Sequence, residues 1–298
     1  MDKNYKRDFI QAGAIAGQVR TYGKNLVKSG ASYNDVIKKI YNKITELGAS
    51  PAFPPQMALN EVAAHFLVQP HEDIIFSDQL VKLDVGVSYK GAIGDCAVTI
   101  DLSGKYQALI DAAESALLQA ENSVKVGLPI REIGKTIAET INSYGFQPIK
   151  NLSGHGLGPY KIHTLPTIPN YDDNSKGRIK PGMTFAIEPF ATNGKGLIYE
   201  KGKPAIFAFA RPGSPRTDTG RLLLEKVKSF NGLPFAIHDM MESMPFIQVE
   251  MGINELLRLG IIVGYPPLIE EKQGMVAQAE NSVLVDENGQ VLITTRLM

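Results

Sequence analysis

The 298-residue chain has one cysteine and no tryptophan, and its formal net charge at pH 7 is zero. A single cysteine excludes an intrachain disulfide framework, and we expect Cys96 to be a reduced, small apolar residue. Balanced charge argues against a main partner that is a nucleic acid, because phosphate binding requires surplus lysine and arginine. No apolar run approaches the ~18 residues of a membrane span. The segment Met1–Asp8 also lacks the apolar part of a signal peptide, so we expect a soluble cytoplasmic protein.

Helical and strand patterns do occur, and they are typical of a mixed α/β chain. Apolar residues make up 44% of the sequence and charged residues 21%, as in ordinary folded proteins. Apolar spacing and terminal signals predict helices over 9–28, 32–48, 104–126 and 130–145, and further ones over 217–230 and 246–260. Strands are expected over 80–100 and near the carboxyl end, on either side of a turn at 286–289.

A weak internal repeat indicates two related halves. The helical stripe Ile37–Gly48 is followed by a loop with proline and then by a strand that carries Asp84. The stripe Ile137–Gly145 is followed in the same order by a proline and by a strand that carries Glu188. Chance similarity is the alternative explanation of this order.

Two acidic residues in apolar strands give the strongest local signal. Every second residue of 81–87 is valine or leucine, so Asp84 faces the opposite side of that strand. If the hairpin turns about Tyr89 and Lys90, Asp84 lies directly opposite Asp95, with Cβ atoms about 4.5–5.5 Å apart. Two carboxylates at that distance repel each other unless one is protonated or cations lie between them. A solvated hairpin face is the alternative.

Three more polar residues interrupt apolar or glycine-rich segments. Glu188 lies in the apolar run 183–191, Glu280 lies in the largely apolar run 274–285, and His155 lies among glycines that permit close backbone approach. Four carboxylates and one imidazole would neutralise two divalent cations, and this donor set suits Mn, Fe, Co or Zn. We therefore predict that the five residues share a metal site.

These residues resemble the five-ligand set of methionine aminopeptidases, and the similarity extends over nearly the whole chain. Segments 151–155, 233–236 and 264–268 resemble the type II branch, as does the helical insertion, and the short amino-terminal segment resembles the archaeal form. One departure surrounds Glu280, where Ala279, Asn281 and Ser282 stand in place of the family's usual Phe, His and Thr. Such neighbours tune metal preference and rate.

The resemblance implies a fold of the α/β (α+β) class. This is the pseudo-twofold pita-bread fold, with a curved, mostly antiparallel sheet flanked by helices. The expected catalytic domain comprises residues 1–194 and 271–298. A type II helical insertion subdomain is expected over 195–270, beside the mouth of the cleft, and it should contribute Tyr265.

The resemblance also implies hydrolysis of the first peptide bond of a chain that begins with methionine, preferably before a small second residue. Two divalent ions per chain, Co, Mn, Fe or Zn, would activate water. The implied metal ligands are Asp84, Asp95, His155, Glu188 and Glu280, with Asp95 and Glu280 bridging the ions. The implied catalytic residues are Glu188, which shuttles the proton, and His65 and His163, which bind substrate. The implied first-residue pocket consists of Phe53, Ile162 and Tyr265, with His65 at its edge.

The expected partner is the N-terminal methionine of nascent polypeptides near the ribosome, with no specific nucleic acid, no membrane and a monomeric state.

One alternative function is that of an X-Pro peptidase of the same fold. Such a peptidase usually carries an added amino-terminal domain, whereas only 83 residues precede Asp84 here. The other is a non-catalytic binding protein of this fold, a class that loses metal ligands. Retention of all five favours the aminopeptidase.

Overall fold

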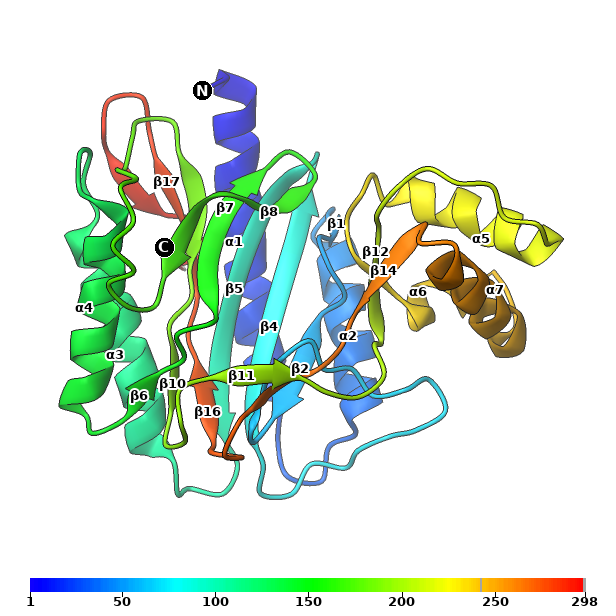
Figure 1. Cartoon of the computed structure of the whole chain (residues 1–298), viewed down its shortest axis with the longest axis horizontal. Coiled ribbons are helices and arrows are strands. Elements are labelled where there is room, and N and C mark those ends of the chain that lie inside the picture. The colour runs from blue at the N-terminus through cyan, green and yellow to red at the C-terminus, as the bar shows by residue number, and fades with distance from the viewer. Residues whose placement is uncertain (242, 297–298) are drawn as a thin grey trace.

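The computed structural model describes residues 1–241 and 243–296, which form helices around antiparallel strands (Figure 1). The helices are α1 (Lys3–Leu26), α2 (Tyr33–Glu46), α3 (Gln107–Ser123), α4 (Ile130–Ser143), α5 (Asp218–Ser229), α6 (Ile237–Met241) and α7 (Phe246–Arg258). Each predicted helix is present, with ends shifted by a few residues. Among the described residues, no helix is both long enough and apolar enough to cross a membrane.

The strands form several small sheets, and every strand pairing described is antiparallel. Strands β1 (Ser50–Pro51), β2 (Gln56–Leu59), β4 (Leu80–Tyr89) and β5 (Ala92–Asp101) form one sheet. A second runs in the order β18 (Val291–Ile293), β17 (Asn281–Val285), β9 (Thr184–Ile187), β7 (Ser153–Gly158) and β8 (Lys161–Pro169). A third sheet joins β16 (Val276–Gln278), β10 (Phe190–Thr192) and β6 (Gln147–Pro148). A fourth joins β11 (Ile198–Glu200), β15 (Leu268–Glu270) and β3 (Val62–Ala64).

Two helix pairs cover these strands, one for each half of the chain. Helices α3 and α4 flank the strands at the left of Figure 1, and α1 lies behind β4 and β5. In α2, Ser32 caps the helix by accepting a hydrogen bond from the Asp35 amide, and Ile37, Ile40 and Ile44 face the core. In α4, the stripe from Ile130 to Ile141 is buried in the same way. Each amphipathic pair thus buries its own apolar core against the strands.

The β4–β5 hairpin has a different register from the predicted one. Asp84 lies opposite Ala97, and Asp95 lies opposite Gly86, so the prediction that the two acids face each other directly is wrong. The reason is the turn, in which Lys90 and Gly91 both have positive φ, 51° and 87°, and form a two-residue connection between Tyr89 and Ala92. Since residues two apart share a face of a strand, Asp84 and Asp95 remain diagonal neighbours on one face.

Residues 195–270 contain strands as well as helices. Strand β12 (Ile206–Phe209) lies between β13 (Phe235–Ala236) and β14 (Ile262–Tyr265), and α5 to α7 pack beside them at the right of Figure 1. Thr217 caps α5 by accepting a hydrogen bond from the Gly220 amide. We propose that residues 195–270 form a subdomain with its own apolar core.

Helix α1 also contacts the carboxyl-terminal part of the chain. A Cβ atom on Gly17 would lie 2.3 Å from the carbonyl oxygen of Thr295, so only glycine permits this approach. Gly13 lies equally close to Thr294, where a Cβ atom would be 2.2 Å from Oγ1. Segments from opposite ends of the described chain are therefore packed directly on each other.

Candidate metal centre

A cavity of about 300 Å³ lies where the two halves meet. Each half contributes acidic residues to it: β4 and β5 supply Asp84 and Asp95, and the β9–β10 connection supplies Glu188. His155 of β7 and Glu280, between β16 and β17, complete the set. The five residues predicted to share a metal site therefore line one cavity.

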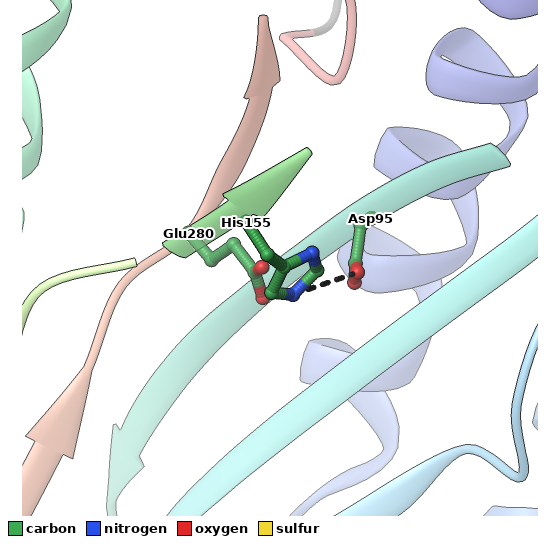
Figure 2. Close-up of side chains that lie close together, drawn as sticks. All are labelled: Asp95, His155 and Glu280. Atoms are coloured by element: carbon green, nitrogen blue, oxygen red, sulfur yellow. Dashed lines mark ion pairs between the residues drawn. The ribbon is translucent and has the colours of Figure 1, made fainter. Parts of the chain in front are cut away.

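Three of these residues form a compact cluster (Figure 2). One ligand atom each from Asp95, His155 and Glu280 lies within 4.8 Å of the others. His155 Nε2 is 3.9 Å from Asp95 Oδ2 and 3.5 Å from Glu188 Oε1. One imidazole nitrogen thus faces several carboxylate oxygens, an arrangement that a divalent cation can occupy.

The side chains of the cluster are buried, and burial disfavours their charged forms. Asp95 and Glu280 are each only 2% exposed. Burial raises the pKa of Asp84 to about 7. Burial raises the pKa of Asp95 and of Glu280 well above the usual range, and repulsion from neighbouring carboxylates raises both further. The pKa of Glu188 is raised in the same way, and burial lowers the pKa of His155 to about 3.

These residues fit divalent cations by an independent structural criterion. Asp84 Oδ1 and Asp95 Oδ1 are buried, and no described residue donates a hydrogen bond to either atom. Unpartnered carboxylate oxygens in a buried site are costly unless a cation or donor meets them. Bound cations would stabilise the ionised carboxylates and reverse the effect of burial on their pKa values.

Backbone contacts hold the two central acids side by side. Ala97 and Glu280 exchange backbone hydrogen bonds of 3.3 Å and 3.2 Å, which attach the Glu280 segment to β5. Ser282 Oγ accepts from the Asp95 amide at 2.8 Å and donates to its carbonyl oxygen at 2.9 Å. Ser282, one of the residues that depart from the family pattern, therefore fixes the backbone at Asp95.

Asn281, another departure, belongs to a buried polar network behind Glu280. Arg20 of α1 donates to the Glu280 carbonyl oxygen at 2.9 Å and to Asn281 Oδ1 at 2.8 Å. Asn281 Nδ2 donates to Glu121 Oε1 at 2.7 Å, and Arg296 also pairs with Glu121. The amide of Asn281 supplies one acceptor and one donor to this network, so the segment around Glu280 is held despite the unusual residue.

The predicted substrate-facing residues line the same cavity. His65 and Tyr265 pack edge to face, with ring centroids 5.5 Å apart, and His163 lies against His155 at 4.5 Å. Phe53 packs over Gly86, where a Cβ atom would lie 2.2 Å from the ring. Ile162 is buried, and Tyr265 brings β14 of the 195–270 segment to the cavity.

His65 is held in an uncommon conformation beside this cavity. Its φ is +60°, a region that non-glycine residues adopt rarely and often near functional sites. Burial, together with repulsion from the charge of His163, lowers its pKa to about 4. His65 is therefore neutral at pH 7 and can donate and accept hydrogen bonds.

Several residues of the cavity wall were not identified from the sequence. They include Gln56, Asn151 and Ser153. Gln56 begins the apolar strand β2, so the criterion that selected Glu188, a polar residue in an apolar run, could have found it. Cys96 is buried, which agrees with the small apolar residue expected, and burial raises its thiol pKa to about 12, which disfavours the reactive thiolate.

Comparison with known proteins identifies relatives over nearly the full chain. The model of metallopeptidase family M24 matches residues 7–287. A methionine aminopeptidase of Methanocaldococcus jannaschii is 39% identical over 289 residues, covering 96% of this chain and 97% of the relative. That of Archaeoglobus fulgidus is 38% identical over 296 residues, covering 99% and 100%.

Solved structures identify the fold. A methionine aminopeptidase from Thermotoga maritima superposes with a TM-score of 0.73 at 21% identity, covering 99% of this chain and 98% of that one. At this identity the likeness concerns the fold alone. The predicted pita-bread fold of mixed α and β structure is confirmed.

Proposed function

Because this chain belongs to metallopeptidase family M24, we propose that its buried acids and His155 hold divalent metal ions and hydrolyse the first peptide bond of a substrate chain. The chain is a hydrolase that removes N-terminal methionine, in line with its similarity over nearly the whole length to methionine aminopeptidases. That similarity favours this activity over an X-Pro peptidase or a non-catalytic protein. The observation that carries the mechanism is the convergence of four carboxylates and one imidazole in a single cavity.

The proposed ligands would hold two divalent ions, for which Co, Mn, Fe or Zn are suitable. Asp95 and Glu280 would be shared between the ions, Asp84 would serve one of them, and His155 with Glu188 would serve the other. When bound, the ions lower the pKa of a water molecule and polarise the substrate carbonyl group. Glu188 would serve as the proton carrier, accepting a proton at its carboxylate and delivering it to the leaving amine.

The two substrate-facing histidines stabilise the reacting peptide group. His163 lies against His155 and is solvent-exposed at the cavity, so it can donate to the carbonyl oxygen as negative charge develops there. His65 acts at the leaving nitrogen. Neither residue is needed to complete the set of five metal ligands.

We expect His65→Ala and His163→Ala to keep the parent metal content and to lose about 10²–10³-fold in kcat, the usual effect of removing one transition-state hydrogen bond. Elemental analysis and steady-state kinetics on the same preparations test this. A variant that binds less metal than the parent would identify its histidine as a ligand and contradict the assigned role.

The metal-free protein should become less stable, relative to the loaded protein, as pH rises. The pKa of Asp84 is about 7 in the folded protein against 3.8 for the free side chain, so the folded state binds the proton more tightly. The stability that protonated Asp84 contributes to the folded state is fully present below about pH 3.8 and is lost as pH rises through about 7. In the loaded protein a bound metal ion takes the place of this proton, so the loaded protein does not lose the same stability.

The measurement is thermal unfolding of dialysed metal-free protein and of loaded protein at pH 5 and pH 8. The difference in Tm between the two forms should be larger at pH 8. Groups that titrate alike in the metal-free and the loaded protein shift both Tm values equally, so their effect cancels in this difference. An equal or smaller difference at pH 8 would contradict the arrangement of buried acids.

We further propose that the substrates are nascent polypeptides that begin with methionine, that a small second residue is preferred, and that the protein acts as a monomer in the cytoplasm near the ribosome. The preference at the second position follows from the resemblance. The decisive experiment removes metal with a chelator, adds back single metals, and compares the peptide Met-Ala-Ser with an Ala-Pro peptide. Metal-dependent cleavage of Met-Ala-Ser is expected, and preferential cleavage of Ala-Pro would favour the X-Pro peptidase.

A further inference from the structure

Gln56 lies in the cavity wall at a position that the mechanism above does not use. It begins β2 and is paired with Asp84 of β4, and its side chain is only 5% exposed. Gln56 Nε2 donates a hydrogen bond of 3.1 Å to Asp84 Oδ2. Because a carboxylate that binds a cation is ionised and accepts without donating, this bond determines which end of the amide faces Asp84 in the metal-loaded protein. The amide oxygen is therefore directed away from Asp84.

The oxygen of this amide, Gln56 Oε1, has no hydrogen-bond partner among the described residues, although it is buried. Buried amide oxygens in folded proteins nearly always accept a hydrogen bond. In the metal-loaded protein, rotating the amide by 180° would place Oε1 against an ionised carboxylate oxygen, which is repulsive. A molecule that enters the cavity can supply the missing donor.

Gln56 also differs from the carboxylates in the cavity. Asp84, Asp95, Glu188 and Glu280 are carboxylates that the proposed metal ions engage. Gln56 Oε1 is a neutral oxygen, and it remains available when those carboxylates are occupied. It belongs to the segment that carries Phe53, three residues earlier, which forms a wall of the proposed first-residue pocket.

We infer that Gln56 Oε1 accepts a hydrogen bond from the free α-amino group of the substrate's first residue, which makes Gln56 a specificity-determining residue for a chain end. This inference rests on the proposed function. The thioether and the carbonyl group of a first methionine donate no hydrogen bond, so its α-amino group is the donor that this residue offers. An internal residue has an acylated, uncharged nitrogen instead, which is a weaker donor.

The same amide connects the substrate to Asp84. The α-amino group donates to Oε1, and Nε2 of the same amide donates to the carboxylate, so the two hydrogen bonds polarise each other. Substrate binding and the orientation of Asp84 are thereby coupled through one planar group.

The test uses Gln56→Met, which has similar length and removes the amide, and Gln119→Met, an exposed position on α3, as the matched control. The probes are L-methioninol and 4-(methylthio)butan-1-ol, which differ only in the α-amino group and contain no bond to hydrolyse. Calorimetry on protein loaded with one metal gives both Kd values for each variant. The parent protein and Gln119→Met should bind methioninol more tightly than the des-amino alcohol.

Gln56→Met should lose about ten-fold or more of this preference, the usual effect of one hydrogen bond to a charged group, with its affinity for the des-amino alcohol and its metal content retained. An unchanged preference would overturn the inference. So would an equal loss of affinity for both probes together with metal loss, because Gln56 would then act only through Asp84. Gln56→Leu gives a second measurement should Gln56→Met fail to fold. Cleavage of Met-Ala-Ser by the parent protein tests the proposed function separately, since it does not depend on either outcome.

Discussion

Asp84→Asn is expected to lower metal affinity and kcat/KM together, by more than the ~10–100-fold that loss of a residue orienting a ligand produces. The substitution preserves the shape of the side chain and removes its negative charge. The neutral amide oxygen that replaces the carboxylate can still accept from Gln56, so packing should be preserved while the attraction for a cation is reduced. The substitution should therefore lower metal affinity while changing the stability of the fold little.

The measurement is metal content after dialysis against limiting metal, followed by steady-state kinetics on Met-Ala-Ser. Asp78→Asn is the matched control, because Asp78 is exposed and lies outside the cavity. Excess metal should restore part of the activity of Asp84→Asn. Parental metal content together with parental activity in this variant would contradict the assignment of Asp84 as a ligand.

A substrate that begins with lysine should be cleaved about 10³-fold or more slowly than the same substrate beginning with methionine. Phe53 and Ile162 are buried apolar walls, and burying an unpaired ammonium group costs several kcal/mol, with each ~1.4 kcal/mol corresponding to a factor of ten. Methionine is unbranched and adapts to irregular apolar space, and its sulfur can contact the ring of Phe53 or Tyr265. Leucine should be rejected less strongly, by about 10–200-fold, because its difference from methionine is one of shape.

This expectation is tested with peptides that begin Met-Gly, Met-Ala, Met-Lys, Leu-Ala and Lys-Ala and are otherwise identical, at one metal and one pH. The Met-Lys peptide tests the second position, where a small residue is preferred, so the pocket is judged from Met-Ala, Leu-Ala and Lys-Ala. Cleavage of Lys-Ala at the rate of Met-Ala would remove the pocket assignment and leave a general aminopeptidase.

Features within one segment were predictable from the sequence, whereas features that join distant segments were not. Glu188 and Glu280 were selected because each is an acid in an apolar run, and such an acid must meet a partner or a cation when buried. The register of Asp84 and Asp95 was wrong because it depends on the turn at Lys90 and Gly91, and a two-residue turn shifts the pairing without changing either strand pattern.

Arg20 is an example of a feature that joins distant segments. Its hydrogen bond to the Glu280 carbonyl group joins residues 260 positions apart, and helical periodicity describes only one face of α1. Gln56 could have been selected as a polar residue in an apolar strand, but its unpartnered oxygen is visible only in the structure. The resemblance to a family identified the ligand set as a whole, but its individual hydrogen bonds required the structure.

The packing of α1 against Thr295, with Arg20 holding the backbone at Glu280, has a consequence for the order in which the protein is made. Translation produces α1 first, yet the partners of Arg20 are synthesised 260 or more residues later. A nascent chain that has reached residue 270 contains four of the five proposed ligands and neither Glu280 nor the segment that receives Arg20. With Glu280 as a ligand, we expect the complete metal site to form only after the carboxyl-terminal strands have been made and packed against the first helix.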